Sequence, residues 1–483
     1  MKQKSIKKNM LMSIILTASN FIFPLITFSY VSRILTPTGT GKVAFVSSII
    51  QYFSYIATLG IPAYGLREAA KVRDNKDKLS KLVHELFIIN IISTILSFIL
   101  LFIAVLCIPK LYDYKILILI MSISIGLNTI GLEWLYNALE EYSYITIRSL
   151  LFKIIYIPLV FLLIHSKSDY LIYGFLTIFV TSANYICNFI NIRKHIYFKK
   201  YDEYNLKKHI KPILVLFSAS IIISIYNNFD VIMIGFMKSE FSVGLYNTAL
   251  KIKNIILSLS TAITAVLIPR IANYIGRKNE KGIKELILKS FKTSMLLSLP
   301  FAIYILIFPK QIILLISGSK YISASPTLQV LMVCIILLIL TNLFGNQLLI
   351  PLGKEKRFSQ SVFVGLFINL FLNLLLIPTY GLFGAAIGTL VTEFWNVIWM
   401  STGVGGYAKY LLKNAKIYIY AISIIIAGLL SFLVYNYVLD IRNIFIVIVT
   451  SIVFFGTYYL QLLLLKEELI HDFLITIKKK VIR

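Results

Sequence analysis

The chain has 483 residues, of which 58% are hydrophobic, whereas soluble domains contain roughly 45–50% apolar residues. Apolar segments such as 86–108 and 328–349 run for about 20 residues, which is the length of a helix that crosses about 30 Å of hydrocarbon. This composition excludes an ordinary soluble enzyme. Transmembrane β-strands would alternate over segments of about 10 residues, so we expect an all-α polytopic membrane protein.

The formal net charge is +27, from 48 Lys and Arg against 21 Asp and Glu. Once helices are placed, about 37 of the basic residues fall on alternate loops or at the termini, as the positive-inside rule requires. These basic segments are 2–8, 67–81, 193–211, 270–289, 354–357, 409–416 and 466–483. They predict a cytoplasmic face that carries both termini and contacts anionic lipids, and they do not imply binding of nucleic acid.

In chain order, hydropathy predicts about 14 membrane-spanning helices. They are 10–35, 43–62, 84–108, 115–137, 149–165, 171–192, 212–237, 243–268, 291–316, 326–349, 360–379, 384–406, 416–439 and 444–465. We expect the first to be a retained helix and not a removable signal peptide. The connections are shorter than the roughly 50 residues of a soluble catalytic domain. We therefore expect no cofactor, and energy from an ion gradient or from the substrate's own gradient.

An internal repeat divides the predicted helices into two sets. Gly41 and Arg67 flank the second helix and Gly244 and Arg270 flank the eighth, each pair 26 residues apart and the two pairs offset by 203. The predicted domains are an N-terminal lobe of six helices (1–195), a basic cytoplasmic linker (196–211), a C-terminal lobe of six helices (212–408) and two appended helices with a tail (409–483). Parallel repeats of this kind surround a central cavity and support alternating access, although chance matches of glycine and arginine are the alternative.

The linker is basic and amphipathic, with aromatic residues interleaved among lysines over 193–211. Such a segment is typical of a surface that lies on an anionic inner leaflet. A direct role in holding a lipid phosphate is the other interpretation.

Several motifs along the first twelve helices resemble one family. They are LGIP at 59–62 with Gly65 and Arg67, WLYNALEE at 134–141, YITIRSLLFK at 144–153, Asp230 with Gly235, VGLYNTALK at 243–251, SGSKY at 317–321, and NLLLIPTYGLFGAAIG at 373–388 leading to Glu393. Together they resemble the polysaccharide transporter family, the Wzx-type oligosaccharide-lipid flippases of the multidrug/oligosaccharidyl-lipid/polysaccharide exporter superfamily. One departure is Asn137-Ala138, where family members often have Gln-Gly.

The resemblance implies a transporter without enzymatic activity in the bacterial cytoplasmic membrane. Its substrate would be an undecaprenyl-diphosphate-linked oligosaccharide, such as an O-antigen unit or another surface polysaccharide unit, moved from the inner to the outer leaflet. A polysaccharide polymerase and glycosyltransferases would be its partners in that pathway.

Charged residues inside apolar helices are the candidate site residues, because charge at bilayer depth usually faces a cavity or a partner. Asp230 and Lys251 are each about eight residues, or roughly 12 Å, from the outer ends of the seventh and eighth helices. They predict either an ion pair within a hairpin or a substrate contact through Lys251. Lys253 points about 200° away from Lys251, so we expect at most one of these two lysines to contact the substrate.

Three more basic residues could form successive sites for a diphosphate. These are Arg33, Arg148 and Lys153, since Arg binds phosphate through its planar donors and Lys binds it as a point charge. Snorkelling to the headgroups is the alternative for the two arginines.

Two carboxylates interrupt the fourth and twelfth helices. Glu133 and Glu393 could bind a coupling proton or sodium ion, or they could be hydrogen-bonded carboxyls packed between helices. No metal or disulfide framework is expected, because the three cysteines show no paired spacing. The scattered histidines are assigned no site.

Two other functions remain open. A cation-coupled multidrug exporter of the same superfamily would favour acidic over basic cavity residues. A membrane glycan polymerase or ligase would need a sizeable outer loop, whereas the outer connections here are about eight residues long.

Overall fold

The computed structural model describes residues 6–437 and 443–471. Every regular element in these residues is a helix, and no strand occurs among them, which confirms the all-α prediction. Parts of the predicted basic termini, 2–8 and 466–483, and most of the connection 440–443 lie outside the described residues. The chain forms two compact units, residues 1–244 and 245–483, and each is described by itself.

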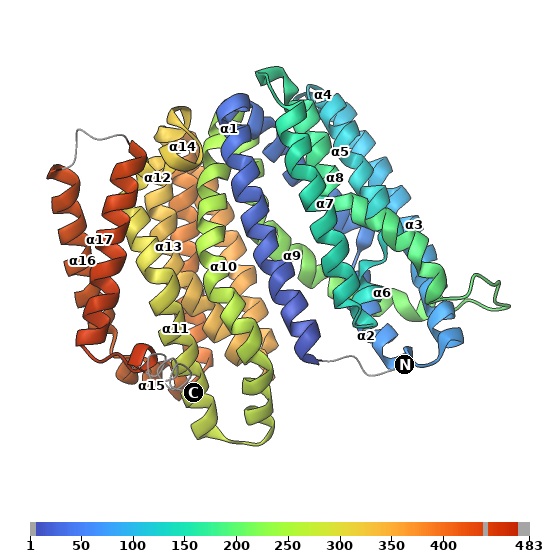
Figure 1. Ribbon diagram of the computed structural model, residues 1–483. Coiled ribbons are helices and arrows are strands. Elements are labelled where there is room, and N and C mark those ends of the chain that lie inside the picture. The colour runs from blue at the N-terminus through green and yellow to red at the C-terminus, as the bar shows by residue number, and fades with distance from the viewer. Residues whose placement is uncertain (1–5, 438–442, 472–483) are drawn as a thin grey trace. The chain divides into compact units, whose positions relative to one another are not determined.

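The first unit is built around a long N-terminal helix that packs on α3, α5 and α7, while α8 covers α5 and α7. These helices run alongside one another over much of their length (Figure 1). In chain order the unit contains α1 (Ile6–Thr58), α2 (Ile61–Val72), α3 (Lys76–Cys107), α4 (Pro109–Tyr112), α5 (Lys115–Gly131), α6 (Glu133–Ala138), α7 (Tyr142–Leu163), η1 (Lys167–Asp169), α8 (Tyr170–Asn191), η2 (Ile192–Lys194) and α9 (Lys207–Met237).

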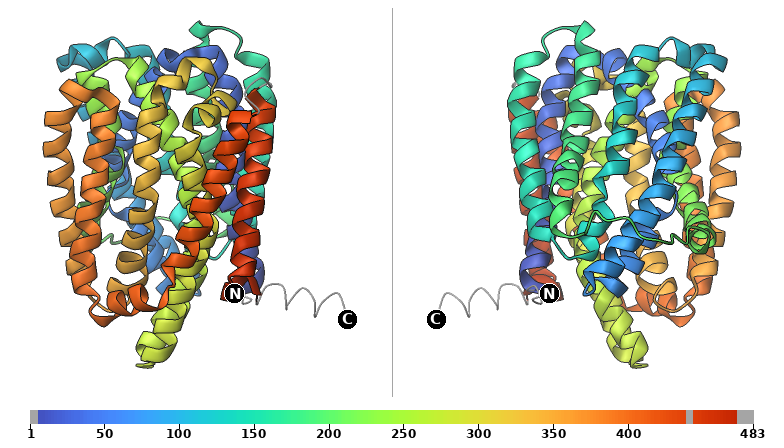
Figure 2. Two further views of the ribbon diagram at one scale, coloured as in Figure 1. Left: turned by 90° about the vertical axis from the view of Figure 1, so that its left-hand side faces the viewer. Right: turned by 90° about the vertical axis from the view of Figure 1, so that its right-hand side faces the viewer.

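The second unit is a set of packed helices in which α13 lies against α11 and α14, and α16 pairs with α17. Its helices are most of α10 (Glu240–Gly276), then α11 (Glu280–Ile307), α12 (Pro309–Ile316), η3 (Ser319–Ala324), α13 (Ser325–Phe344), η4 (Gly345–Leu349), α14 (Glu355–Gly403), α15 (Gly406–Asn414), α16 (Ile417–Tyr437) and α17 (Asn443–Leu464). Within this unit, α10 and α11 extend past their neighbours at one end (Figure 2).

Eleven helices among the described residues are long and apolar enough to cross a membrane. Two of them contain a sharp break, at Thr36 (φ 61°, ψ 174°) in α1 and at Gly381 (φ 56°, ψ −133°) in α14. Each break falls where the sequence predicts an outer turn between two spans, 10–35 and 43–62 or 360–379 and 384–406. With these two helices counted as pairs and α10 added, the structure is consistent with about 14 spans.

The compact units and the predicted domains divide the chain at different places. The boundary between the units is at Gly244 within α10, whereas the sequence places a linker at 196–211. The reason is that α9, which follows the linker, packs on α1 and α2 of the first unit. The lobes 1–195 and 212–408 rest on the sequence repeat, and they stay a prediction.

The basic linker is an irregular segment tied to the start of α3. Tyr197 donates its backbone N–H to Ser80 Oγ (2.8 Å), and the Tyr201 hydroxyl donates to the carbonyl oxygen of Asp77 (3.0 Å). Tyr197 and Phe198 remain exposed. The contact of this linker with a membrane surface stays a prediction.

Candidate functional site

A break between α5 and α6 positions the first candidate residue. Leu132 adopts the left-handed conformation (φ 41°, ψ 41°), and α6 begins at the next residue, Glu133. A non-glycine residue in this conformation is uncommon and must be held by its surroundings. Leu132 is buried in the apolar cluster formed by α2, α3 and α6, which fixes the position of the Glu133 carboxylate.

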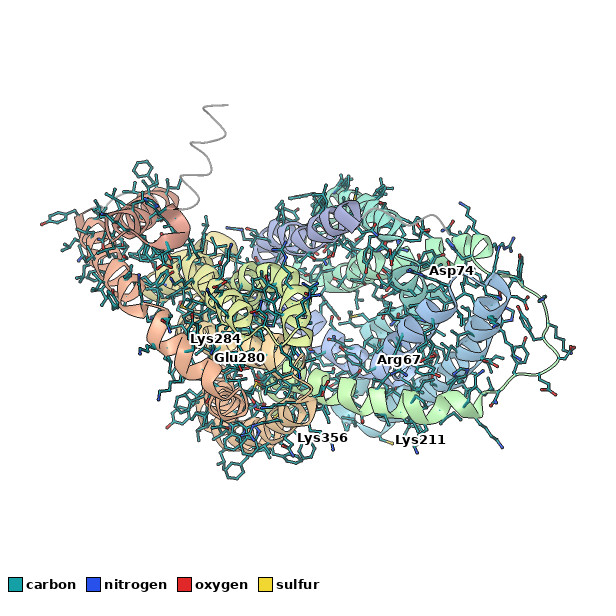
Figure 3. The ribbon with its side chains drawn as sticks, turned by 90° about the horizontal axis from the view of Figure 1, so that it is seen from below. Arg67, Asp74, Lys211, Glu280, Lys284 and Lys356 are labelled. Atoms are coloured by element: carbon teal, nitrogen blue, oxygen red, sulfur yellow. The ribbon has the colours of Figure 1, made fainter. Side chains whose placement is uncertain are left out.

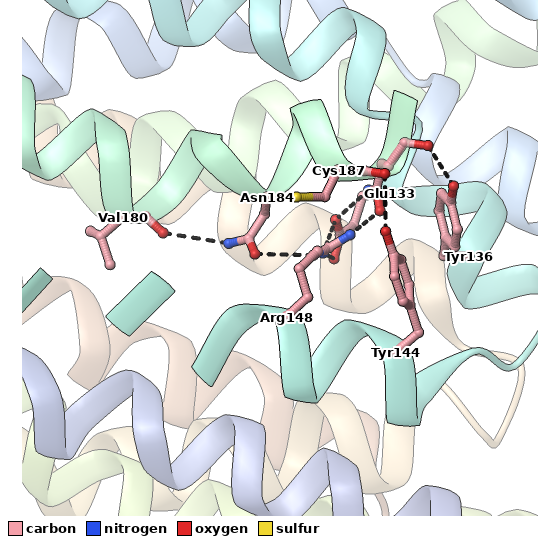
Figure 4. A network of polar contacts seen from close by, with 8 residues as sticks. Glu133, Tyr136, Tyr144, Arg148, Val180, Asn184 and Cys187 are labelled. Atoms are coloured by element: carbon pink, nitrogen blue, oxygen red, sulfur yellow. Dashed lines mark hydrogen bonds and ion pairs between the residues drawn. The ribbon is translucent and has the colours of Figure 1, made fainter. Parts of the chain in front are cut away.

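Arg148 on α7 and Glu133 on α6 belong to one polar network with two asparagines of α8 (Figure 4). The guanidinium donates to Glu133 Oε2 (3.0 Å), to Asn184 Oδ1 (3.0 Å) and to Asn188 Oδ1. Asn188 also donates to Glu133 Oε2 (3.1 Å). The side chain of Arg148 is 6% exposed and that of Glu133 34%, so this ion pair is buried on the arginine side only.

Two tyrosines complete the surroundings of Arg148. The guanidinium carbon lies 5.2 Å from the centre of the Tyr144 ring, and the Tyr144 hydroxyl donates to the carbonyl oxygen of Cys187 (3.0 Å). Tyr136 stacks on Tyr144 and donates to the carbonyl oxygen of Asn188 (2.6 Å). Arg148 is therefore packed between α6, α7 and α8.

Lys153 lies further along α7 and has a different environment. Its residue exposure is 7%, and its ammonium group donates to Ser19 Oγ (2.7 Å) and Asn20 Oδ1 (2.6 Å) of α1. Both acceptors are neutral. Among the described residues no carboxylate forms an ion pair with Lys153, so the structure buries a cation with polar but uncharged partners.

Arg33 occupies the last turn of α1 before the break at Thr36. It is exposed, and its guanidinium donates to Ser29 Oγ (2.7 Å) one turn earlier on the same helix. Its position near the predicted outer end suits either a contact with phosphate or a headgroup contact.

Glu393 in the second unit is 1% exposed and accepts a hydrogen bond from Thr341 Oγ1 (2.9 Å) of α13. Further buried polar contacts occur along α14. Ser361 donates to Asn396 Oδ1 (2.8 Å), and Asn373 donates to Asn369 Oδ1 (3.0 Å). The Glu393 carboxyl group thus lies between helices beside a hydroxyl donor. This arrangement suits both predicted roles, the binding of a coupling ion and packing as a hydrogen-bonded carboxyl.

The sequence predicts that Asp230 and Lys251 lie level with each other and that Lys253 points to another face. Asp230 is buried on α9 in the first unit, whereas both lysines are partly exposed on α10 in the second unit. The pairing of Asp230 with Lys251 would join the two units, and it stays a prediction. The substrate and ion roles of the other candidates also stay predictions.

Sequence reasoning missed a second buried ionic cluster in the first unit. Glu85 on α3 is 1% exposed and accepts from His209 (2.9 Å) and Lys208 (3.0 Å) at the start of α9. The available signal was an acid within an apolar segment, at the second residue of the predicted span 84–108. Histidine spacing alone gave no indication, because Glu85 and His209 are 124 residues apart.

The long apolar helices and the charges buried between them define a polytopic membrane transporter. A family model described as polysaccharide biosynthesis protein matches residues 6–275, and the MatE family model matches residues 216–375. The chain therefore belongs to the polysaccharide biosynthesis protein family, within the exporter superfamily that the sequence motifs resemble. It is a transporter and not an enzyme.

Relatives span most of the chain. A protein of Escherichia coli (strain K12) named "Putative O-antigen transporter" is 26% identical over 394 residues, covering 80% of this chain and 94% of that protein. A second protein of that name, from Shigella dysenteriae, is 23% identical over 413 residues, covering 82% of this chain and all of that protein.

Solved structures share the fold at lower identity. The lipid II flippase MurJ in an inward closed conformation aligns with a TM-score of 0.72 and 18% identity, covering 95% of this chain and 99% of that one. An inward-facing multidrug resistance transporter of the MATE family aligns with a TM-score of 0.60 and 14% identity, covering 83% and 99%. These similarities show the fold alone.

Proposed function

We propose that the protein is a flippase that moves a polyprenyl-diphosphate-linked oligosaccharide from the inner to the outer leaflet of a bacterial cytoplasmic membrane. Family membership and the names of the Escherichia coli and Shigella dysenteriae relatives support a role in building a surface polysaccharide, such as an O-antigen. The glycan polymerase and the glycosyltransferases of that pathway would be its partners. Transport would proceed by alternating access and without covalent chemistry.

The observation that carries this proposal is the environment of Lys153. A buried charge without an opposite charge is costly, because the attraction of a counter-ion is missing. Ser19 and Asn20 hold the ammonium group by hydrogen bonds and leave its positive charge uncompensated. A diphosphate group would supply the missing negative charge during transport, so we assign Lys153 the first phosphate contact.

The other candidates take different roles in this proposal. Arg148 is already engaged by Glu133, Asn184 and Asn188, which makes it a weaker phosphate ligand than Lys153. Lys251 would provide a second contact deeper in the path, and Arg33 an outer one. Lys253 points to another face of its helix.

The coupling ion would be a proton or Na⁺ bound at an intramembrane carboxylate. Glu393 is the stronger candidate, because it is 1% exposed and accepts from the Thr341 hydroxyl, whereas Glu133 is one-third exposed and paired with Arg148.

The experiment measures transport in vesicles that contain the purified protein and a matched lipid-linked oligosaccharide. We expect Lys153→Met to lower the rate per molecule at least about tenfold with unchanged protein in the membrane, which is the cost of roughly one charged contact to phosphate. Lys292→Met is the matched control, since Lys292 is equally buried but is paired with Glu468 at 2.6 Å. If the wild-type protein does not move the lipid-linked oligosaccharide, the proposed flippase function is refuted. Normal transport by Lys153→Met would show that Lys153 does not contact the substrate.

A multidrug exporter is the second candidate, favoured by the match of the MatE family model to residues 216–375. The excess of basic over acidic candidates argues against it, because drugs of that class are usually cationic. Drug susceptibility of a deletion strain separates the two functions. We expect loss of surface polysaccharide with unchanged drug susceptibility, and the reverse result would favour the exporter.

A further inference from the structure

A cavity of about 610 Å³ lies within the second unit, where the end of α11, the start of α12, η3 and the start of α13 meet the last turns of α16. Its volume lies in the range of small-molecule sites, roughly 300–1,000 Å³. Both α11 and α16 start beside basic segments that are assigned to the cytoplasm, 270–289 and 409–416. Their other ends, and with them the cavity, are therefore predicted to lie at the outer leaflet. None of the residues assigned above to transport lines this cavity.

Aromatic rings form one wall of the cavity. The centre of the Tyr435 ring lies 5.5 Å from that of Phe308 and 6.4 Å from that of Phe432. Phe308 is 2% exposed and Phe432 is 49% exposed, so the wall runs from the interior of the unit to its surface. Leu429 and Leu433 of the same helix are more than half exposed. In a membrane, apolar surface of this kind contacts lipid chains, and aromatic residues near a helix end lie at the level of the headgroups.

Hydrogen bonds of two amide side chains hold this wall in place. Gln311 donates to the Tyr435 hydroxyl (2.9 Å), and Gln329 donates to the carbonyl oxygen of Leu306 (3.1 Å) at the end of α11. The hydrogen of the Tyr435 hydroxyl is donated to no described residue, so it is available to an acceptor in the cavity. An apolar wall with a few fixed polar groups is typical of a ligand site.

A lysine supplies the charge of the cavity. Lys310, the second residue of α12, lines the cavity and is exposed. Its ammonium group forms no hydrogen bond or ion pair with any described residue. By contrast, the exposed Lys416 of the same unit is paired with Glu468 (3.0 Å). No Asp or Glu is among the described residues that line the cavity, so its electrostatics favour an anionic ligand.

We propose that this cavity is a binding site for an anionic phospholipid of the outer leaflet. Lys310 contacts the phosphate as a point charge, the Tyr435 hydroxyl donates to a phosphate or ester oxygen, and an acyl chain continues along Phe432. The exposed apolar surface beside the cavity favours a lipid over a free sugar or a soluble phosphate. The bound lipid would connect the end of α16 to α12. This site goes beyond the proposed flippase function, because it requires neither the transported substrate nor transport.

The test measures binding of the first phosphatidylglycerol molecule to the purified full-length protein by native mass spectrometry. We expect Lys310→Gln to weaken this binding at least about fivefold, which corresponds to the gain of roughly 1 kcal/mol for a lysine near anionic lipid. Lys320→Gln is the matched control, because Lys320 is also exposed on the same side but does not line the cavity. Its binding should stay within about twofold of the wild type. An equal loss in the two variants would reveal a general effect of surface charge and overturn the site.

A second pair of variants tests the cavity without a change of charge. Ser323 lines the cavity and is exposed, so Ser323→Trp would place a large ring in the space for the lipid. Ser319→Trp is the control, because Ser319 is exposed on the same 3₁₀ helix outside the cavity. We expect only Ser323→Trp to weaken binding of phosphatidylglycerol, again at least about fivefold. Equal melting temperatures verify that both variants fold, and unchanged binding by Ser323→Trp overturns the inference.

Other probes identify the chemistry of the occupant. Zwitterionic phosphatidylcholine should bind the wild type at least about fivefold more weakly than phosphatidylglycerol, and millimolar glycerol phosphate should not displace the lipid. Equal binding of phosphatidylcholine, or of a neutral glycosyl diacylglycerol, would show that the charge of the headgroup is not recognised and would overturn the proposal. Displacement by glycerol phosphate would identify a soluble anion as the ligand and would overturn it as well. None of these measurements involves transport, so their outcome is separate from that of the proposed function.

Discussion

The environment of Arg148 is set by hydrogen-bond partners on two other helices. Its guanidinium has five N–H donors, and side chains from two other helices accept hydrogen bonds from them. Sequence reasoning selected Arg148 and Glu133 separately, one as a phosphate ligand and the other as an ion site. The structure brings the two residues together, so a change at either one alters the environment of the other.

A double-mutant cycle on Arg148 and Glu133 tests this pairing. We expect Glu133→Gln to lower the free energy of unfolding by about 1–3 kcal/mol, less than the 3–5 kcal/mol of a fully buried pair because Glu133 is one-third exposed. The coupling energy with Arg148→Gln should lie at about 1–3 kcal/mol. Unfolding in mixed detergent micelles measures both quantities.

The matched control is the pair Arg73 and Glu140. These side chains are 2.7 Å apart and are 37% and 41% exposed, whereas Arg148 and Glu133 are 3.0 Å apart. Exposed pairs contribute about 0–1 kcal/mol. Equal coupling energies in the two cycles would contradict the view that burial sets the strength of the Arg148 pair.

At the scale of elements, α9 is attached to the first unit at its start by charge and close packing. His209 bridges Glu85 of α3 (2.9 Å) and the Tyr64 hydroxyl of α2 (2.8 Å). Gly60, between α1 and α2, approaches α9 so closely that a Cβ would lie 2.3 Å from the carbonyl oxygen of Ile213. The start of α9 is therefore fixed to α2 and α3 on two sides.

Replacement of the histidine should loosen this attachment. His209→Phe keeps a ring in place but leaves the buried Glu85 carboxylate and the Tyr64 hydroxyl each without one partner, which costs about 1–3 kcal/mol. We expect faster hydrogen exchange over the first turns of α9, measured by mass spectrometry. His84→Phe is the control, because His84 is only partly buried. Unchanged exchange in His209→Phe would mean that Gly60 and its neighbours suffice to hold the helix.

The segment that follows α17 is attached to α11 and to the start of α16 by a further ionic cluster. Glu468 accepts from Lys292 (2.6 Å) and from Lys416 (3.0 Å), while the Tyr420 hydroxyl donates to Glu467 (2.9 Å). The hydrogen bond from Lys292, with that from Lys416, holds the pKa of Glu468 below its ordinary value of 4.5. The end of α17 is thus fixed by charges close to the predicted cytoplasmic surface.

This cluster predicts a dependence of stability on pH. A carboxyl whose pKa is lower in the folded state stabilises that state above its unfolded pKa, and the contribution disappears as the pH falls through the lower folded value. Since Glu468 is more than half exposed, the contribution should be at most about 1 kcal/mol. When the pH is lowered below 4.5, we expect the melting temperature of Glu468→Gln to decrease less than that of the wild type. Parallel curves for the two proteins would contradict this role.

At the scale of the whole molecule, the loop charges can be followed within each unit. Arg67, Asp74 and Lys211 lie at one end of the helices of the first unit (Figure 3). In the second unit, Glu280, Lys284 and Lys356 likewise lie at one end. These positions belong to the segments that the positive-inside rule assigns to the cytoplasm.

Cysteine labelling tests this orientation. In a variant without the three native cysteines, we expect an impermeant reagent outside intact cells to label Ser168→Cys and Lys320→Cys. Lys200→Cys and Lys281→Cys should react only after the membrane is opened. All four side chains are exposed, so access across the membrane alone separates the pairs. Labelling of Lys200→Cys or Lys281→Cys in intact cells would contradict the predicted topology, because these residues would then lie on the outer side.

The sequence by itself determined the all-α membrane fold, the approximate spans and the family. Hydropathy and loop charge are properties of consecutive residues, because the bilayer acts on each helix separately. For the same reason the breaks at Thr36 and Gly381 were predictable as outer turns. The motifs that carry the family resemblance are equally local.

Only the tertiary structure decided which charged residues are partners. Glu133 and Arg148, or Glu85 and His209, lie on different helices, and their contact depends on how those helices pack and rotate. Likewise, the repeat of Gly41 at Gly244 is readable in the sequence, but that the two glycines meet is not. Local composition fixes where a helix lies relative to the bilayer, whereas its neighbours are chosen by packing between segments far apart in the chain.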